Sequence, residues 1–144
     1  MKKSLLAVGL TAISLSSLAQ LSPAGNWHTV DEKTGEIKSE IRVTDNGGTV
    51  SGAIAKLLRK DAKQDQVCDQ CTDDRKDKPL IGMQIIRGAK KAEGKDVWED
   101  GKILDPENGK TYGLRLTPID GGKKLEVRGS IGPFGRTQTW VRTQ

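Results

Sequence analysis

A short polar segment, DPENGK at residues 105–110, is the feature that most constrains this fold. Asp, Pro, Asn and Gly favour tight turns because their backbones or side chains suit a chain reversal. The segment lies between residues 98–104 and 111–116, and in the second of these Tyr112, Leu114 and Leu116 alternate with less apolar positions. Since successive side chains of a strand point to opposite faces, we expect a β-hairpin with one buried face. Asp100-Gly101 predicts a further turn within the first of the two segments.

The rest of the chain repeats this pattern of short apolar segments and turn residues. Strands are expected at 25–30, 37–43, 49–57, 79–86, 124–130 and 136–142, with a charged turn at 87–94 and turn signals at 45–48, 120–122 and 132–135. About eight or nine strands without a helix predict an all-β fold, a small antiparallel up-and-down β-barrel. Residues 58–78 are rich in Lys, Asp and Gln and predict one long surface excursion.

The N-terminus has the pattern of an export signal. Lys2 and Lys3 precede an apolar or small-residue run at 5–18, and Ser17 and Ala19 are small. We expect cleavage between Ala19 and Gln20, a signal peptide at 1–19 and a single barrel domain at 20–144. A membrane anchor is the weaker interpretation, because a spanning helix needs about 20 apolar residues. The predicted location is periplasmic or secreted, with no transmembrane segment in the mature chain.

The two cysteines, Cys68 and Cys71, lie within the excursion. In an oxidising compartment the default prediction is a disulfide between them. A redox role is less favoured because neighbouring aspartates oppose a low thiol pKa. A zinc site needs about four ligands, and the single histidine, His28, is far away in sequence. We therefore expect neither a metal nor another cofactor.

Composition also limits the function classes. The chain has a net charge of +5, to which Lys2 and Lys3 contribute. Its basic residues are mixed with acidic ones along the sequence, and aromatic residues make up 3% of the chain. This pattern argues against nucleic-acid binding, which favours basic clusters and stacking groups. His28 follows Trp27 in an expected structural strand, so no nucleophile–base pair is indicated. No catalytic residue is predicted; a non-enzymatic role is favoured, and an enzyme is left open as an alternative.

The two ends of the predicted barrel carry a further signal. Gly25-x-Trp27 in the first strand and Arg142 in the last resemble lipocalin-like barrels, in which a tryptophan seals the closed end beneath a cationic side chain. On the last strand Arg136, Gln138 and Trp140 share a face with Arg142. If this face points inward, its polar groups either satisfy one another or line a pocket for an anionic or amide group.

Longer blocks extend the comparison over the mature chain. They are Gly25-x-Trp27 with Asp31, residues 77–83 (DKPLIGM), residues 101–112 (GKILDPENGKTY), residues 125–132 (LEVRGSIG) and residues 135–142 (GRTQTWVR). With these blocks and the cysteine pair, the chain resembles the bacterial family called domain of unknown function 2147. The resemblance implies a small exported β-barrel without an established activity and without catalytic residues to transfer.

The leading hypothesis is non-enzymatic binding of a small molecule in or at the mouth of the barrel. The predicted ligand-binding residues are Trp27, Trp98, Tyr112, Arg136, Gln138 and Trp140. The alternative is an envelope protein–protein interaction module that uses residues 58–78 against an unidentified partner, and the third hypothesis is a hydrolytic enzyme.

Overall fold

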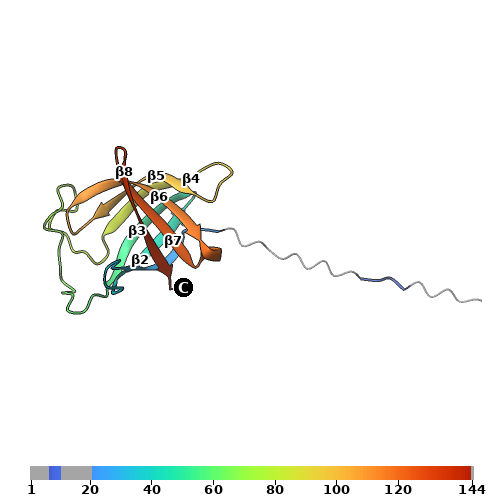
Figure 1. Ribbon diagram of the computed structural model, residues 1–144, viewed down its shortest axis with the longest axis horizontal. Helices are drawn as coiled ribbons and strands as arrows, with labels where there is room; N and C mark the ends of the chain where they lie inside the picture. The colour runs from blue at the N-terminus through green and yellow to red at the C-terminus, as the bar shows by residue number, and fades with distance from the viewer. Residues whose placement is uncertain (1–6, 11–20, 144) are drawn as a thin grey trace, which may run out of the picture.

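The computed structural model describes residues 7–10 and 21–143, so the predicted cleavage site between Ala19 and Gln20 lies outside the described residues. Eight strands form a closed barrel in which each strand pairs antiparallel with the next and β8 pairs with β1 (Figure 1). This confirms the predicted up-and-down β-barrel. The strands are β1 (Gly25–Val30), β2 (Ile37–Asn46), β3 (Thr49–Leu57), β4 (Gln84–Lys91), β5 (Trp98–Asp105), β6 (Lys110–Ile119), β7 (Lys124–Ile131) and β8 (Phe134–Arg142), with the short 3-10 helix η1 (Asp120–Gly122) between β6 and β7.

Three sequence predictions about strand limits were wrong. Asp100-Gly101 does not turn the chain, because β5 continues through both residues. The irregularity is absorbed as a β-bulge: Asp100 has φ +63°, and the register to β6 shifts between Trp98 and Gly101. Gly101 also permits close packing, since an added Cβ would lie 2.9 Å from Ala89. Likewise the sheet resumes at Gln84 instead of Pro79, and β4 includes residues 87–91, which were expected in a turn.

One end of the barrel is sealed by Trp27. Its side chain is fully buried, and its indole Nε1 donates a hydrogen bond to the Pro23 carbonyl at 2.8 Å. The guanidinium of Arg142 lies 4.2 Å from the Trp27 ring centroid, a cation–π distance. Arg142 also donates to three backbone carbonyls at 2.6–2.8 Å, those of Ser22, Ala24 and Gly122. Burial lowers the pKa of this guanidinium. The closed end therefore has the arrangement predicted from Gly25, Trp27 and Arg142.

Apolar side chains fill the half of the barrel next to this closed end. They come from opposite ends of successive strands, because neighbouring strands run antiparallel. The residues are Trp27, Val43, Val50, Ala89, Trp98, Leu116 and Leu125, each at most 4% exposed. The packed half leaves the other half of the interior available for a site.

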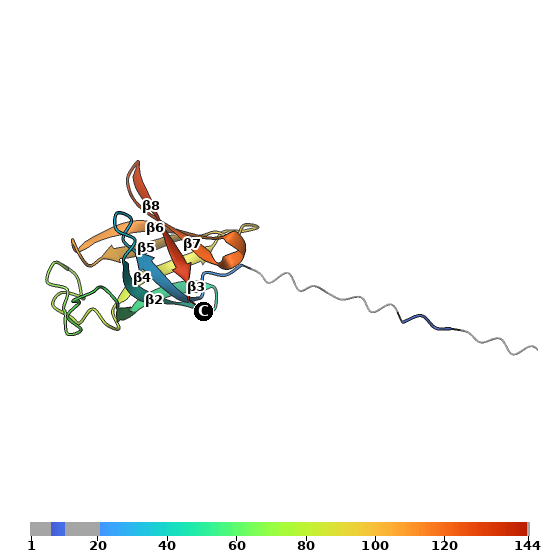
Figure 2. The same cartoon turned by 60° about the horizontal axis from the view of Figure 1, so that its bottom comes forward.

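In the structure the excursion spans the whole connection between β3 and β4, residues 58–83, and lies at the opposite end, in green on the left of Figures 1 and 2. It contains the predicted disulfide between Cys68 and Cys71. Although its composition predicted a surface excursion, both of its cysteines are 1% exposed and Arg75 is 7% exposed. The segment is therefore packed against the barrel instead of extending freely into solvent.

Candidate ligand-binding site

A cavity of about 380 Å³ lies between the open half of the barrel and the excursion. Its inner wall is apolar, with one or more side chains from most of the strands: Ile41, Ile54, Ile85, Ile103, Leu104, Val127 and Trp140. The barrel interior holds Ile41, Ile54, Ile103, Val127 and Trp140, because strand side chains alternate between the interior and the outer surface. Ile85 and Leu104 alternate with Ile86 and Ile103, so they border the cavity from the other face of their strands and are 5% and 2% exposed. The excursion contributes Ala62, Gln66 and Leu80, so it forms part of the cavity wall. The volume is at the lower end of the range for small-molecule pockets.

Polar groups border the same cavity on the side of β1, β2 and β8. The hydroxyls of Thr29 and Ser39 are hydrogen-bonded at 2.7 Å. Gln138 lines the cavity from β8, and so does Trp140, which is 2% exposed. The interior therefore combines an apolar wall with a small uncharged polar group.

Charged residues lie around the mouth. Arg59 approaches Glu107 at 3.0 Å and Asp31 at 3.9 Å, and Lys38 approaches the same Glu107 at 3.4 Å. A hydrogen bond from the Lys33 backbone amide is the main cause that lowers the pKa of Asp31. These ion pairs link the β1–β2 loop, the start of β2, the excursion and the β5–β6 turn. Because water reaches these half-buried or exposed side chains, each pair stabilises the arrangement only weakly.

A further ion pair joins β8 to the β1–β2 loop. Arg136 donates to Glu32 at 2.9 Å, and this hydrogen bond raises the pKa of Arg136. The three cations that line the mouth, Lys38, Arg59 and Arg136, thus each have a carboxylate partner.

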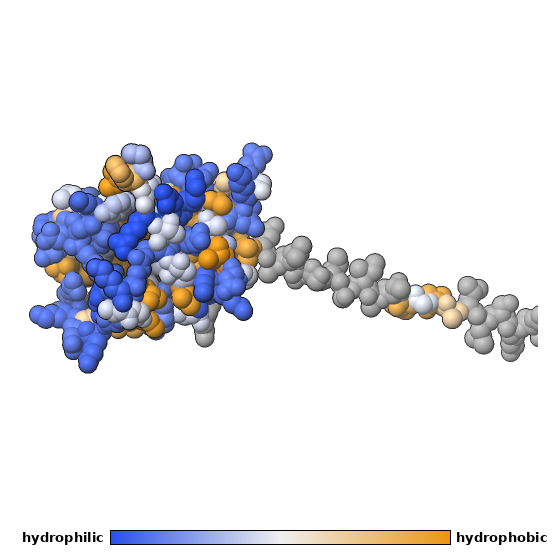
Figure 3. Space-filling model, viewed as in Figure 1, coloured by the Kyte–Doolittle hydropathy of each residue, from blue (hydrophilic) through white to orange (hydrophobic). Residues whose placement is uncertain are grey.

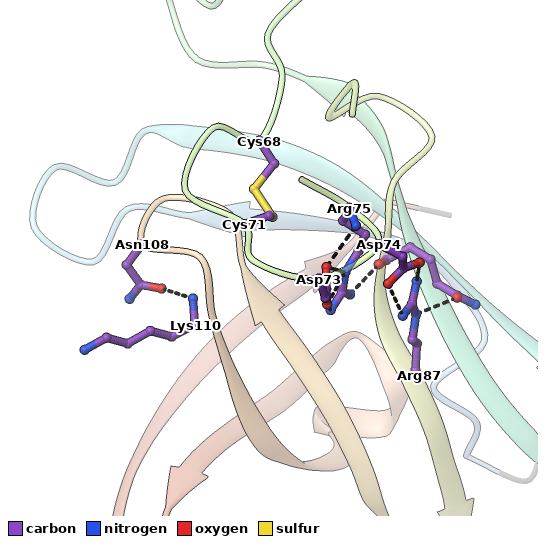
Figure 4. Close-up of polar contacts among 9 residues, drawn as sticks. Cys68, Cys71, Asp73, Asp74, Arg75, Arg87, Asn108 and Lys110 are labelled. Carbon is purple, nitrogen blue, oxygen red and sulfur yellow. Dashed lines mark hydrogen bonds and ion pairs between the residues drawn. A yellow bond between two sulfur atoms is a disulfide. The ribbon is translucent and has the colours of Figure 1, made fainter. Parts of the chain in front are cut away.

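The β5–β6 turn holds the excursion in place. Gly109 has φ +73°, and a Cβ added there would overlap the carbonyl oxygen of Gln70. The Cys68 Sγ lies 3.8 Å from the Pro106 carbonyl oxygen. Within the turn, the Asn108 side-chain oxygen accepts a hydrogen bond from the Lys110 amide at 2.8 Å (Figure 4). The β5–β6 turn, formed by the DPENGK segment at residues 105–110, is therefore the surface against which the disulfide-containing segment packs.

Two arginine–aspartate pairs anchor the other side of the excursion (Figure 4). Arg75 binds Asp73 and donates to the Gln84 carbonyl at 2.8 Å, where β4 begins. The side-chain hydrogen bond from Arg75 is the main cause that lowers the pKa of Asp73 from 3.8 to about 2. Arg87 of β4 pairs with Asp74 at 3.0 Å and lowers the pKa of that carboxyl.

The structure places the six predicted ligand-binding residues in two groups. Tyr112, Arg136, Gln138 and Trp140 line the cavity. Trp27 seals the closed end, and Trp98 is 4% exposed within the packed half, with the Lys91 ammonium 5.9 Å from its ring centroid. Neither Trp27 nor Trp98 lines the cavity. Ligand contact by any of the six stays a prediction.

Several lining residues were not singled out from the sequence. Strand alternation offered a signal for Ser39 and Ile54, which lie on the inward face of their strands. Arg59, Gln66 and Leu80 had no such signal, because their position depends on how the excursion folds back over the mouth.

His28 lies outside the cavity. Its Nε2 is 3.5 Å from the Glu40 carboxylate, and its side chain is 27% exposed. Among residues 7–10 and 21–143, no group of three His, Cys, Asp or Glu side chains is arranged to hold a metal ion. Within the same ranges, no helix has the length and apolar character needed to cross a membrane.

Comparisons with known proteins agree with this architecture. Residues 25–142 match the family model described as "Uncharacterized protein conserved in bacteria (DUF2147)". A search of the curated proteins finds no match. The fold is similar to that of protein HP1028 from the human pathogen Helicobacter pylori, described as belonging to the lipocalin family. The TM-score is 0.72 at 20% identity, over 86% of this chain and 84% of the other, which shows a shared lipocalin-like fold.

Proposed function

The chain belongs to the bacterial family of uncharacterized proteins DUF2147, and since the description of that family names no activity, we propose a function from the geometry of the chain's own site. The protein is a non-enzymatic barrel that binds a small amphipathic molecule in the cavity beneath the excursion. The observation that carries this proposal is the cavity of about 380 Å³ inside an otherwise packed barrel.

The physical argument begins with packing. Protein interiors are normally close-packed, and voids lined by apolar side chains lower stability because the lining atoms lose contacts. Ile41 and Ile54 border the cavity at 1% and 3% exposure, so most of their surface is packed against protein. A ligand with an apolar body restores the missing contacts, which supports binding as the role of the space.

The distribution of polar groups supports an amphipathic ligand. The inner wall is apolar, whereas Lys38, Arg59, Glu107 and Tyr112 border the mouth. An apolar body at the inner wall leaves a polar end near the mouth, where it is solvated or hydrogen-bonded. The face in Figure 3 is mostly hydrophilic, and its apolar residues occur in small separate groups. That surface offers less to a large apolar partner than the cavity offers to a small molecule.

We place this activity outside the cytoplasm, in the periplasm or the medium. The signal-like pattern at residues 1–19 supports export, and the disulfide between Cys68 and Cys71 suits an oxidising compartment. The excursion that carries the disulfide acts as a cover of the cavity in this proposal.

A neutral fluorescent probe, N-phenyl-1-naphthylamine, tests the proposal. We expect saturable one-to-one binding with enhanced fluorescence. Ile54→Trp adds an indole inside the cavity and should abolish binding, whereas Lys56→Trp adds the same group on the outer face of β3, where the Lys56 side chain is 64% exposed. Equal binding by both variants, with both folded, would place the probe elsewhere and contradict the proposal. Native mass spectrometry of protein from its own cell envelope then identifies any retained ligand.

A further inference from the structure

We propose that the inner polar side of the cavity is a hydrogen-bonding subsite for an uncharged carbonyl or amide oxygen of the ligand. Gln138 and Trp140 of β8 form this subsite beside the Thr29–Ser39 hydroxyl pair. The inference rests on the proposed ligand binding and adds the chemical class of the group that the cavity recognises.

The first observation is an unpaired buried donor. Among the described residues, the indole Nε1 of Trp140 is the one buried side-chain nitrogen or oxygen without a hydrogen-bond partner. Buried indole nitrogens normally find an acceptor, because an unpaired donor loses its hydration without compensation. Trp27 shows that this fold can satisfy such a group, since its Nε1 donates to the Pro23 carbonyl at 2.8 Å. Trp140 differs from Trp27 in that it borders the cavity.

The second observation is the side chain of Gln138. It lies two residues before Trp140 on the same face of β8, is half-buried and borders the cavity. No hydrogen bond joins its amide group to another side chain or to the backbone within the described chain. An amide offers both donors and an acceptor, so it can bind a ligand oxygen directly. In this proposal the side chains around the Trp140 nitrogen, Gln138 among them, move as the ligand binds, because that nitrogen exposes less than 1 Å².

The third observation concerns charge. An indole N–H only donates, so the ligand group that satisfies it must be an acceptor. The lining cations Lys38, Arg59 and Arg136 are already paired with carboxylates at the mouth. An ionised carboxylate at the inner end would lose hydration among apolar side chains without a free cation to compensate. A neutral carbonyl or amide oxygen fits the subsite better than an anion.

Isothermal titration calorimetry with two-ring probes of equal body tests this inference. The probes are 2-acetylnaphthalene, which has a ketone, 2-ethylnaphthalene, which has no acceptor, and 2-naphthoate, which is anionic. For each protein we compare the ratio of the Kd for the ethyl probe to the Kd for the acetyl probe. The free probes are hydrated equally in every titration, so their hydration cancels when this ratio is compared between wild-type and variant protein.

Gln138→Met and Trp140→Phe keep much of the side-chain volume but remove the polar groups. We expect each to lower the ratio about tenfold, the effect of one hydrogen bond in an apolar site. Thr139→Val is the matched control, because it removes a hydroxyl from the exposed outer face of the same strand, outside the cavity, and should leave the ratio unchanged. Thermal unfolding of all variants checks that they are folded.

The outcomes separate the two proposals. Failure of wild-type protein to bind any of the three probes would contradict the proposed ligand binding. Binding with an unchanged ratio in both β8 variants would overturn the subsite while leaving ligand binding intact, and so would tighter binding of 2-naphthoate than of 2-acetylnaphthalene. A lower ratio in one variant alone supports the subsite and assigns its donor to that residue.

Discussion

The contact between the β5–β6 turn and the excursion predicts a large difference between two Gly→Ala substitutions. Gly109 and Gly35 have almost the same backbone angle, φ +73° and +74°. An added Cβ at Gly35 meets nothing within 4 Å, whereas at Gly109 it overlaps the carbonyl oxygen of Gln70. The pair therefore separates the cost of a left-handed alanine from the cost of displacing the excursion.

The magnitudes follow from these two effects. A non-glycine residue in the left-handed region costs about 1–2 kcal/mol, which is the whole effect expected for Gly35→Ala. Overpacking adds about 1–3 kcal/mol in a packed contact. Since the neighbouring atom at Gly109 is backbone and cannot rotate away, Gly109→Ala is expected to lower the free energy of unfolding by about 2–5 kcal/mol. Cys68 and Cys71, both buried beside this contact, have to move with Gln70.

Urea unfolding followed by tryptophan fluorescence measures both free energies. Binding of N-phenyl-1-naphthylamine provides a second readout, because Gln66 and Leu80 of the excursion line the cavity. We expect weaker probe binding for Gly109→Ala and unchanged binding for Gly35→Ala. Equal destabilisation by the two substitutions, together with equal probe affinity, would refute the conclusion that the turn supports the excursion.

Three further predictions concern the closed end, the excursion and the packed half. Arg142→Ala removes three hydrogen bonds to carbonyls and the contact with the Trp27 ring. It should lower the free energy of unfolding, measured by urea titration, by about 3–5 kcal/mol. A loss below about 1 kcal/mol would contradict the sealing role. Asp73 has a pKa of about 2 in the folded protein against 3.8 ordinarily, so its contribution to the free energy of unfolding is present above about pH 4 and is lost as the pH falls towards 2. Asp73→Asn should remove this part of the acid dependence of unfolding. An acid unfolding profile identical to that of the wild type would argue against the pair with Arg75. Trp98→Phe should lower the free energy of unfolding by about 1–3 kcal/mol while leaving probe affinity unchanged, because Trp98 is buried away from the cavity. Weaker probe binding by this variant in calorimetry would instead place Trp98 in the binding site.

The up-and-down barrel was predictable because its signals are local. Alternation in residues 111–116 and the turn residues at 45–48 and 120–122 define strands and hairpins through short-range geometry. Asp100-Gly101 shows the limit of such signals. A bulge and a turn both use a positive φ, and the pairing of β5 with β4 and β6 decides that the chain continues straight.

The sequence alone determined which face of a strand each side chain occupies, but not its depth along the barrel. Trp27, Trp98 and Trp140 all point inward, yet only Trp140 borders the cavity, because depth depends on register and on the tilt of all eight strands. The cover of the cavity was likewise decided by tertiary structure. Residues 58–78 carry little apolar periodicity. Their disulfide and the Asp73–Arg75 pair are local, but the contacts that hold the segment against the barrel, Asp74 with Arg87 and Gln70 with Gly109, join positions further apart in the chain.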